Sequence, residues 1–382
     1  MRYPVILILI FFVLTISLPL NGLPLPSEKE KKFDAYLNEF RNSIKFSSMI
    51  NPSSDSAKRE KKKFFDFRVQ GRRYEPQFEY TRLSSKAVKN YRLINQEKLK
   101  NTIYSDLLTE SFEINKLKMF LIQMRGRPAI FTLFGSRLYP LPSRKEIARA
   151  ENFLASIKEK SISQKNFGSQ KMKAILTKAL EEKDLKHWQV IISNQMSANA
   201  SVLPGSRKIK VRESAKFDEL DAKRLIVHEI GVHACRAERG HKMPLKIFST
   251  GLKGYLETEE GMAACNEFRN GIKTGLRLFA LRLLAVHWAS IGSFSEVFKK
   301  LIDHGATEEE AWKISQRVKR GLTDTGKKGC YPKDALYFKG FLKINSELKK
   351  DIHLWKRLMK YGKIGINHLP RLEILDHMTN LK

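Results

Sequence analysis

The sequence predicts an α+β fold that is predominantly α-helical, with a small antiparallel sheet next to a helix that carries two histidines. Two kinds of pattern support this fold class. Apolar residues recur at helical spacing over residues 84–124 and over most of the chain after residue 216. Residues 188–192 are too few and too rich in β-branched side chains for a helix, and residues 198–213 contain two apolar runs around a Pro-Gly-Ser turn. The strands therefore form a minor part of a helical protein.

Composition and charge narrow the class of protein. The chain has 382 residues, of which 42% are hydrophobic, with only 13 Pro and 21 Gly, which excludes a disordered or collagen-like chain. The 71 Lys and Arg residues outnumber the 40 Asp and Glu residues, giving a formal charge of +31. A broad positive field follows, so we expect anionic partners. The three cysteines are too few for a disulfide framework.

The N-terminal part of the chain differs from the rest. Arg2 precedes an apolar stretch that is shorter than the ~18–20 residues needed to cross a bilayer, so residues 1–22 predict a signal peptide, with an uncleaved anchor as the alternative. This predicts an exported protein, periplasmic or secreted. Residues 23–73 carry lysine-rich runs and predict a basic, partly flexible segment. Residues 74–382 are then expected to form one large domain.

Further helices are expected from periodicity and from capping signals. The helical pattern also covers residues 143–160 and 170–183. Ser293 with Glu296, and Thr307 with Glu310, have the spacing of capping boxes, in which the two side chains bond each other's backbone N–H groups. We therefore expect helices to begin after Ser293 and Thr307.

Two histidines flank a glutamate on the helical segment at residues 228–233. His228 and His233 supply two imidazoles and Glu229 a carboxylate, which are the groups that a catalytic zinc needs. Five residues separate the histidines, so on a regular helix they would diverge by about 140°. A π-bulge, eased by Gly231, would bring both rings to one side. On spacing alone, a metal site and two ordinary helix histidines are equally good interpretations.

A third metal ligand is expected from an acidic segment downstream. Four glutamates lie within residues 257–267, in a chain that is otherwise poor in acid. A carboxylate from such a following element would complete a three-ligand zinc site. Taken alone, the segment could equally be the solvated acidic start of a helix.

The two motifs together resemble a known family of metallopeptidases. Residues 228–233 read His-Glu-Ile-Gly-Val-His, and residues 258–263 read Thr-Glu-Glu-Gly-Met-Ala. This combination resembles the family formerly called domain of unknown function 1704, which includes the microtubule-associated tyrosine carboxypeptidases and bacterial proteins named after a Gln-Glu-Gly-Leu-Ala motif. The resemblance extends over roughly residues 70–345. Met262 replaces the usual Leu, and Glu259 stands where the bacterial motif has Gln.

The resemblance implies a zincin-like zinc carboxypeptidase that acts on protein C-termini. His228, His233 and Glu260 would hold Zn²⁺, with Glu259 as the reserve ligand. Glu229 would activate the water, and residues 74–382 would be the catalytic domain. A cation is also needed for the substrate carboxylate. The candidate substrate-binding residues lie where the resemblance continues downstream: Arg317, Arg320, Lys333 and Tyr337. Each has an ordinary alternative, namely a charged helix face, a loop lysine or a packed tyrosine.

The expected partner is a protein or peptide C-terminus, with acidic tails favoured by the positive charge. An extended substrate would add a strand to a sheet edge, for which we expect residues 208–213. The N-terminal segment could contact an anionic membrane. Nucleic acid is not expected, because no aromatic and basic stacking motif is found. The alternative function is a non-catalytic basic protein that binds anionic polymers or envelope surfaces.

Overall fold

The computed structural model describes residues 23–95, 99–100, 102–157, 165–194, 196 and 198–380, with side chains up to residue 377. The chain divides into two compact units. The first unit comprises residues 1–34, 159–273 and 340–382, and the second comprises residues 35–158 and 274–339. Two of the four boundaries fall within helices, α1 (Glu28–Ile44) and α16 (Leu336–Lys350). A single catalytic domain over residues 74–382 stays a prediction.

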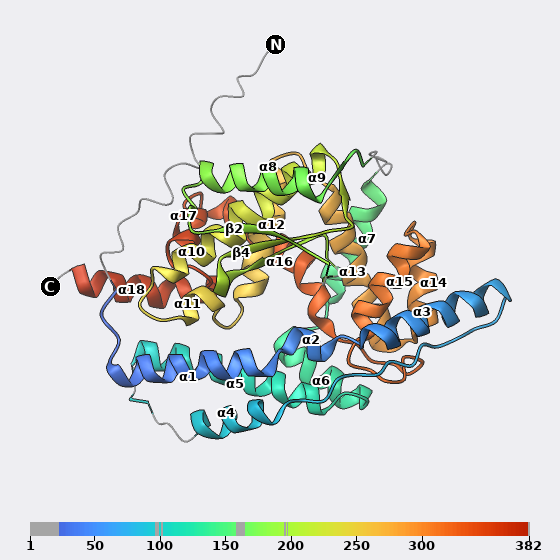
Figure 1. The fold of residues 1–382 in the computed structure, drawn as a ribbon, viewed down its shortest axis with the longest axis horizontal. Coiled ribbons are helices and arrows are strands. Elements are labelled where there is room, and N and C mark those ends of the chain that lie inside the picture. Colours follow the sequence, from blue (N-terminus) through green and yellow to red (C-terminus); the bar gives the residue numbers. More distant parts are fainter. Residues whose placement is uncertain are drawn as a thin grey trace, which may run out of the picture. The chain divides into compact units, whose positions relative to one another are not determined.

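Helices make up most of both units, and the strands lie in the first (Figure 1). The first unit contains β1 (Phe167–Gly168), α8 (Ser169–Glu182), β2 (Gln189–Ser193), β3 (Ala200–Leu203), η3 (Pro204–Ser206), β4 (Lys208–Arg212), β5 (Lys216–Phe217), α9 (Glu219–Leu225), η4 (Ile226–Ala234), α10 (Cys235–His241), α11 (Ile247–Thr250), α12 (Tyr255–Arg269), α17 (Leu354–Lys360), η6 (Ile366–His368) and α18 (Leu369–Asn380). The second unit contains α2 (Phe46–Ile50), α3 (Ser54–Val69), α4 (Ser85–Asn95), α5 (Ile103–Gln123), α6 (Pro128–Leu138), α7 (Arg144–Ser156), α13 (Thr274–Ile291), α14 (Phe294–Asp303), α15 (Glu308–Lys319) and η5 (Pro332–Ala335). The predominantly helical α+β class is confirmed.

The main sheet is mixed rather than purely antiparallel. Its strand order is β2-β4-β3, with β3 antiparallel to β4 and β2 parallel to β4. The prediction of an antiparallel sheet is therefore wrong for β2, because β4 inserts between the two strands that precede it. The expected edge at residues 208–213 is also wrong, since β4 is the central strand. The edges are β2 and β3.

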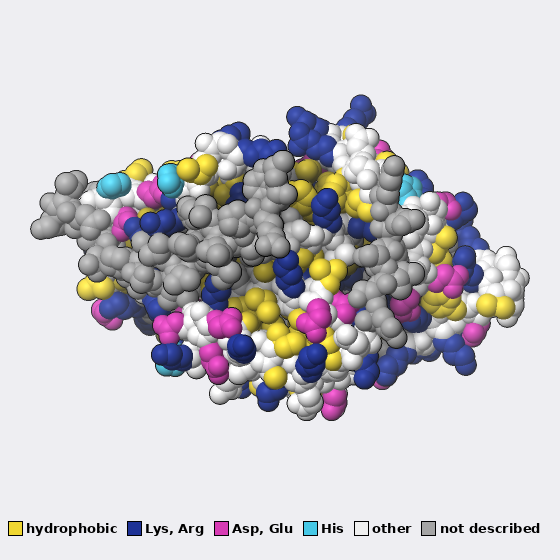
Figure 2. Space-filling model, turned by 90° about the horizontal axis from the view of Figure 1, so that it is seen from above, with side chains coloured by type: hydrophobic (Ala, Val, Ile, Leu, Met, Phe, Trp, Pro, Cys, Tyr) yellow, Lys and Arg dark blue, Asp and Glu magenta, His cyan; other side chains and the backbone are white. Residues whose placement is uncertain are grey.

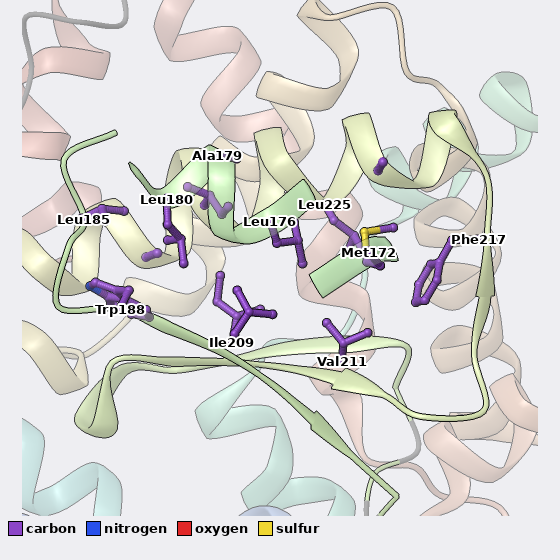
Figure 3. Close-up of a cluster of buried hydrophobic side chains, with 14 of the residues drawn as sticks. Met172, Leu176, Ala179, Leu180, Leu185, Trp188, Ile209, Val211, Phe217 and Leu225 are labelled. Atoms are coloured by element: carbon purple, nitrogen blue, oxygen red, sulfur yellow. The ribbon is translucent and has the colours of Figure 1, made fainter. Parts of the chain in front are cut away.

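The core of the first unit lies between α8 and the main sheet. Met172, Leu176 and Leu180 of α8 lie over Ile209 and Val211 of β4 (Figure 3). Residues of α9, η4 and α10 belong to the same buried cluster. The helix that carries the histidines is therefore anchored to the sheet by the core itself.

The basic N-terminal segment is mostly helical where the structure describes it. The lysine-rich run at residues 58–63 lies in α3, which begins after the N-cap Ser53. Phe64 of this helix is buried and packs against Phe298 and Trp312, with ring centroids 4.9 and 5.3 Å away. The run is thus the polar part of a packed helix. On the face shown in Figure 2, Lys and Arg side chains are spread among acidic and hydrophobic ones rather than gathered in one patch.

Both predicted capping boxes are confirmed in the second unit. Ser293 and Glu296 exchange side-chain and backbone hydrogen bonds at the start of α14, as do Thr307 and Glu310 at the start of α15. These local signals therefore placed two helix starts correctly.

Two glycines allow α12 and α16 to cross closely in the first unit. A Cβ added to Gly261 would lie 2.3 Å from the carbonyl oxygen of Gly340. A Cβ on Gly340 would lie 2.3 Å from the carbonyl oxygen of Glu257. Both neighbours are backbone atoms, so the helices would have to separate to admit a side chain. The glycine of the Glu-Glu-Gly-Met-Ala motif is thus a packing requirement.

We expect Gly261→Ala to lower the free energy of unfolding by about 1–3 kcal/mol, because the added methyl group overpacks a backbone contact. Urea denaturation of the full chain measures it. Gly205→Ala is the matched control, since a Cβ there meets nothing within 4 Å. Equal stability of the two variants would contradict the packing argument.

Candidate metal centre

The two histidines lie on a π-helix. Helix α9 begins with a capping box between Asp218 and Asp221 and leads directly into η4, a π-helix over Ile226–Ala234, which continues as α10. The wider turn places the rings of His228 and His233 with their centroids 4.9 Å apart. The distortion expected from the five-residue spacing is therefore present, and both rings face one place.

Helix α12 supports the widened backbone. The side-chain amide of Asn266 donates a hydrogen bond to the carbonyl of Val227, with a distance of 2.7 Å. A Cβ at position 231 would lie 3.1 Å from that amide nitrogen. Gly231 therefore leaves the room that Asn266 needs to reach the π-helix.

Glu260 of α12 meets both imidazoles. Its Oε2 lies 3.6 Å from Nε2 of His228 and 3.7 Å from Nε2 of His233. All three residues are buried, and their ligand atoms lie within 4.8 Å of one another. Zinc bonds of about 2.0–2.1 Å in a tetrahedral site place ligand atoms about 3.3–3.4 Å apart. Two nitrogens and one carboxylate oxygen at these separations fit a zinc ion.

The other nitrogen of each ring is held by a second carboxylate. Nδ1 of His228 lies 2.6 Å from Oε1 of Glu267, and Nδ1 of His233 lies 2.8 Å from Oε1 of Glu259. A carboxylate accepts, so each Nδ1 carries a proton, and Nε2 is the nitrogen that each ring turns toward Glu260. Glu259, the reserve ligand, therefore lies behind His233 rather than beside Nε2.

Charge at the centre favours a cation. Burial lowers the pKa of His228, but hydrogen bonds to Glu260 and Glu267 raise it, and the net effect raises the pKa to about 10. Burial raises the pKa of Glu259, but the charges of Lys363, His233 and Arg236 outweigh it and hold the pKa well below its usual range. The carboxylates of Glu260 and Glu267 thus favour positive charge on His228, which a proton or a metal ion can supply.

Glu229 is placed differently from the other glutamates. It follows His228 on the π-helix and is only partly buried. Within the described part of the chain, nothing donates a hydrogen bond to its carboxylate. Glu229 is therefore available to accept a proton from a molecule bound at the centre.

The predicted substrate-binding residues lie in the second unit and gather around an aspartate. Arg317 donates two hydrogen bonds to Asp334, at 2.5 and 3.0 Å, and Arg320 donates one at 2.9 Å. Tyr337 stacks on Phe279 with centroids 5.1 Å apart. Lys333 precedes Asp334 in η5. The arginines thus have a structural partner that the sequence analysis did not assign.

Three residues around the metal centre were not assigned roles from the sequence. Glu267 follows Glu260 by seven residues, which puts both within about 20° on one helix face, so this spacing could have revealed it. Arg236 follows His233 by three residues, close to one helical turn. Lys363 lies 104 residues beyond Glu259, and no local signal indicates it.

Comparison with known proteins gives the family. A family model described as microtubule-associated tyrosine carboxypeptidase matches residues 63–381. The chain belongs to this family.

Three relatives carry the family's name. The chain is 30% identical over 158 residues to microtubule-associated tyrosine carboxypeptidase 1 from Mus musculus, covering 40% of this chain and 34% of the relative. The Rattus norvegicus protein of that name is 30% identical over 157 residues, with the same coverage. The Homo sapiens protein is 29% identical over 158 residues, again with 40% and 34% covered. The chain thus aligns with about a third of the length of these curated relatives.

The family membership corrects the expected location. The prediction of an exported protein, periplasmic or secreted, is wrong, because the family and these relatives are named for association with microtubules. Among the described residues, no helix has the length and apolarity to span a membrane. The apolar residues 1–22 lie outside the described residues.

We expect Asp334→Asn to destabilise the protein by about 2–4 kcal/mol at pH 7. Breaking a buried ion pair costs about 3–5 kcal/mol, and this is reduced because the Arg317 side chain is 34% exposed. Urea denaturation measures the change, with Asp324→Asn as the control, since Asp324 is 40% exposed and 3.8 Å from Lys327.

The same variant should also change the pH dependence of stability. Burial raises the pKa of Asp334, but the surrounding guanidinium charges hold it well below its usual range. A lowered native pKa gives stability that is present at neutral pH and is lost as the pH falls below about 4. Asp334→Asn should therefore lose less stability than the wild type on acidification, and an unchanged slope would contradict this assignment.

Proposed function

We propose that the chain is a zinc-dependent carboxypeptidase of zincin-like fold that removes the last residue from protein C-termini. The observation that carries the proposal is the convergence of two imidazole Nε2 atoms and one carboxylate oxygen at a buried place, with a partly exposed glutamate beside them. The relatives are named tyrosine carboxypeptidases, so a C-terminal tyrosine is the proposed residue removed.

His228, His233 and Glu260 would hold the zinc ion. Bound in such a site, zinc lowers the pKa of its water toward neutrality and polarises a peptide carbonyl. Glu267 and Glu259 hold the two rings by their Nδ1–H groups, so the Nε2 atoms stay directed at the metal. The chain thus supplies ligands that are oriented before the substrate arrives.

Glu229 would move the proton. It would accept a proton from the attacking water as the oxygen–carbon bond forms, and donate it to the amine of the departing residue as the carbon–nitrogen bond breaks. The partly exposed carboxylate, to which no described residue donates a hydrogen bond, supports this role. The products are a shortened chain with a new carboxylate and one free amino acid.

The positive charge of the second unit supports a place for the substrate carboxylate. Asp334 is one carboxylate under the charges of three guanidinium groups, those of Arg282, Arg317 and Arg320. Asp334 neutralises one of these three positive charges, and two remain for an anionic ligand. We propose that Arg317, Arg320 and Lys333 bind the terminal carboxylate, with Tyr337 as a further donor, and that the overall charge of +31 favours acidic tails.

Strand β3 supports docking of an extended tail. It is an edge strand and lies beside the π-helix. The N–H of Arg212 donates to the carbonyl of Asn199 at 2.9 Å, so these two residues form a hydrogen-bonded pair. In an antiparallel ladder, hydrogen-bonded and non-hydrogen-bonded pairs alternate along the strand. Ala200 and Val202 therefore direct their backbone N–H and C=O groups away from β4. A peptide strand could pair with these groups.

We expect the purified chain to hold about one zinc per molecule and Glu229→Gln to keep it, because Glu229 is not a ligand. The loss of the general base should lower kcat by about 10²–10⁴ on peptides ending in tyrosine. Zinc analysis and mass spectrometry of the peptides, with and without a chelator, measure both. Glu257→Gln is the control, since Glu257 on α12 pairs with Lys343 of α16 at 3.4 Å. A zinc-free wild type that still binds acidic polymers would support the non-catalytic alternative instead.

We expect Val202→Pro to raise KM for an extended peptide by about 2–10-fold, because it removes one outward N–H worth about 0.5–1.5 kcal/mol without breaking the β3–β4 pairing. Steady-state kinetics measure this, with zinc content unchanged. Ile192→Pro on β2 is the matched control. The N–H of Gln189 donates to the carbonyl of Arg207, and the parallel register then directs the N–H of Ile192 away from β4. Equal KM values for the two variants would exclude β3 as the docking edge.

A further inference from the structure

A segment near the C-terminus lies directly against the elements that carry the ligands. The N–H of Ile366 donates to Thr258 Oγ1 on α12 at 2.9 Å. The guanidinium of Arg236 on α10 donates to the carbonyl of Ile364 at 2.7 Å. Residues 361–366, called here the C-terminal strap, therefore bridge α10 and α12 behind the metal centre.

The strap also joins α11 and the loop that follows it by backbone hydrogen bonds. Lys363 N–H donates to the carbonyl of Phe248 at 2.7 Å, and Leu252 N–H donates to the carbonyl of Lys363 at 3.0 Å. Gly362 has a φ of +77°, and a Cβ there would lie 2.6 Å from the Cα of Gly240. The backbone on both sides of Lys363 is thus fixed, which fixes the direction of its side chain.

The ammonium group of Lys363 contacts the carboxylate of Glu259, which lies behind His233. Lys363 is only 3% exposed, and its Nζ contacts Oε1 of Glu259, the same oxygen that accepts from His233. The second oxygen of Glu259 lies 3.3 Å from Arg236, which is fully buried. Two buried cations therefore hold one carboxylate in the position that orients the imidazole.

The two histidines are not held alike. Glu267, behind His228, has Arg224 at 3.6 Å, and within the described part of the chain its Oε2 has no hydrogen-bond partner. No residue of the strap contributes a contact to that carboxylate among the interactions described. The orientation of His233 thus depends on the strap, whereas that of His228 depends on α9 and α12.

We propose that Lys363 is a positioning residue for the metal centre, acting through Glu259 on His233. The inference rests on the proposed function in one respect, namely that these histidines bind zinc. Partners that orient a metal-bound histidine typically change metal affinity by about 10–100-fold when they are removed. Lys363 would thus be required for tight zinc binding although it lies far from every ligand in the sequence.

The test is zinc affinity of the full chain, measured by competition with a chromophoric chelator. We expect Lys363→Met to raise the zinc dissociation constant by about 10–100-fold and to alter the visible spectrum of the Co²⁺-substituted protein. Lys343→Met is the matched control, since it removes a lysine that pairs with Glu257 on α12 outside the centre. It should bind zinc as the wild type does.

A double variant separates positioning from folding. Lys363→Met leaves Glu259 with one buried cation fewer, which could prevent folding, whereas Glu259→Gln with Lys363→Met removes both charges of the pair. We expect the double variant to fold, by circular dichroism in a chelator, and still to bind zinc about 10-fold or more weakly. Zinc binding within twofold of the wild type in either folded variant would overturn the role of Lys363. A wild type that does not bind zinc would instead overturn the proposed function.

Discussion

The candidate metal centre depends on the spacing of two histidines in one helix. Two imidazoles five residues apart can meet one ion only where the helix is wider than an α-helix, and the π-helix of η4 provides that width. Such a turn is less favourable than regular helix, so other parts of the fold must hold it. The buried core of α8 and the sheet anchors its outer side, and Asn266 of α12 binds one of its carbonyls.

Helix α12 contacts the π-helix through side chains along much of its length. Glu259, Glu260 and Glu267 all come from it, so one rigid element supplies a candidate ligand and both carboxylates that contact the Nδ1 atoms of the rings. Gly261 allows this helix to approach α16 closely, which explains why a glycine follows Glu260. Metal binding and helix packing therefore place demands on adjacent positions of one short motif.

Local features could be read from the sequence because their causes are local. The capping boxes at Ser293 and Thr307 require only four residues each, and the distortion between His228 and His233 follows from their spacing. The parallel pairing of β2 with β4 could not be read in this way, since hairpin signals do not reveal that a later strand inserts between earlier ones. Lys363 was missed for the same reason, because a buried lysine that binds a distant glutamate has no period and no motif.

The C-terminal strap has a consequence for the timing of biosynthesis. The histidines and Glu260 are all synthesised more than about a hundred residues before the strap, and chains begin to fold from the N-terminus as they emerge. A chain that stops short of residue 363 thus contains all three candidate metal ligands but lacks the buried ammonium behind Glu259. The contacts around Glu259 are therefore completed only after residue 363 has been synthesised and has packed behind His233.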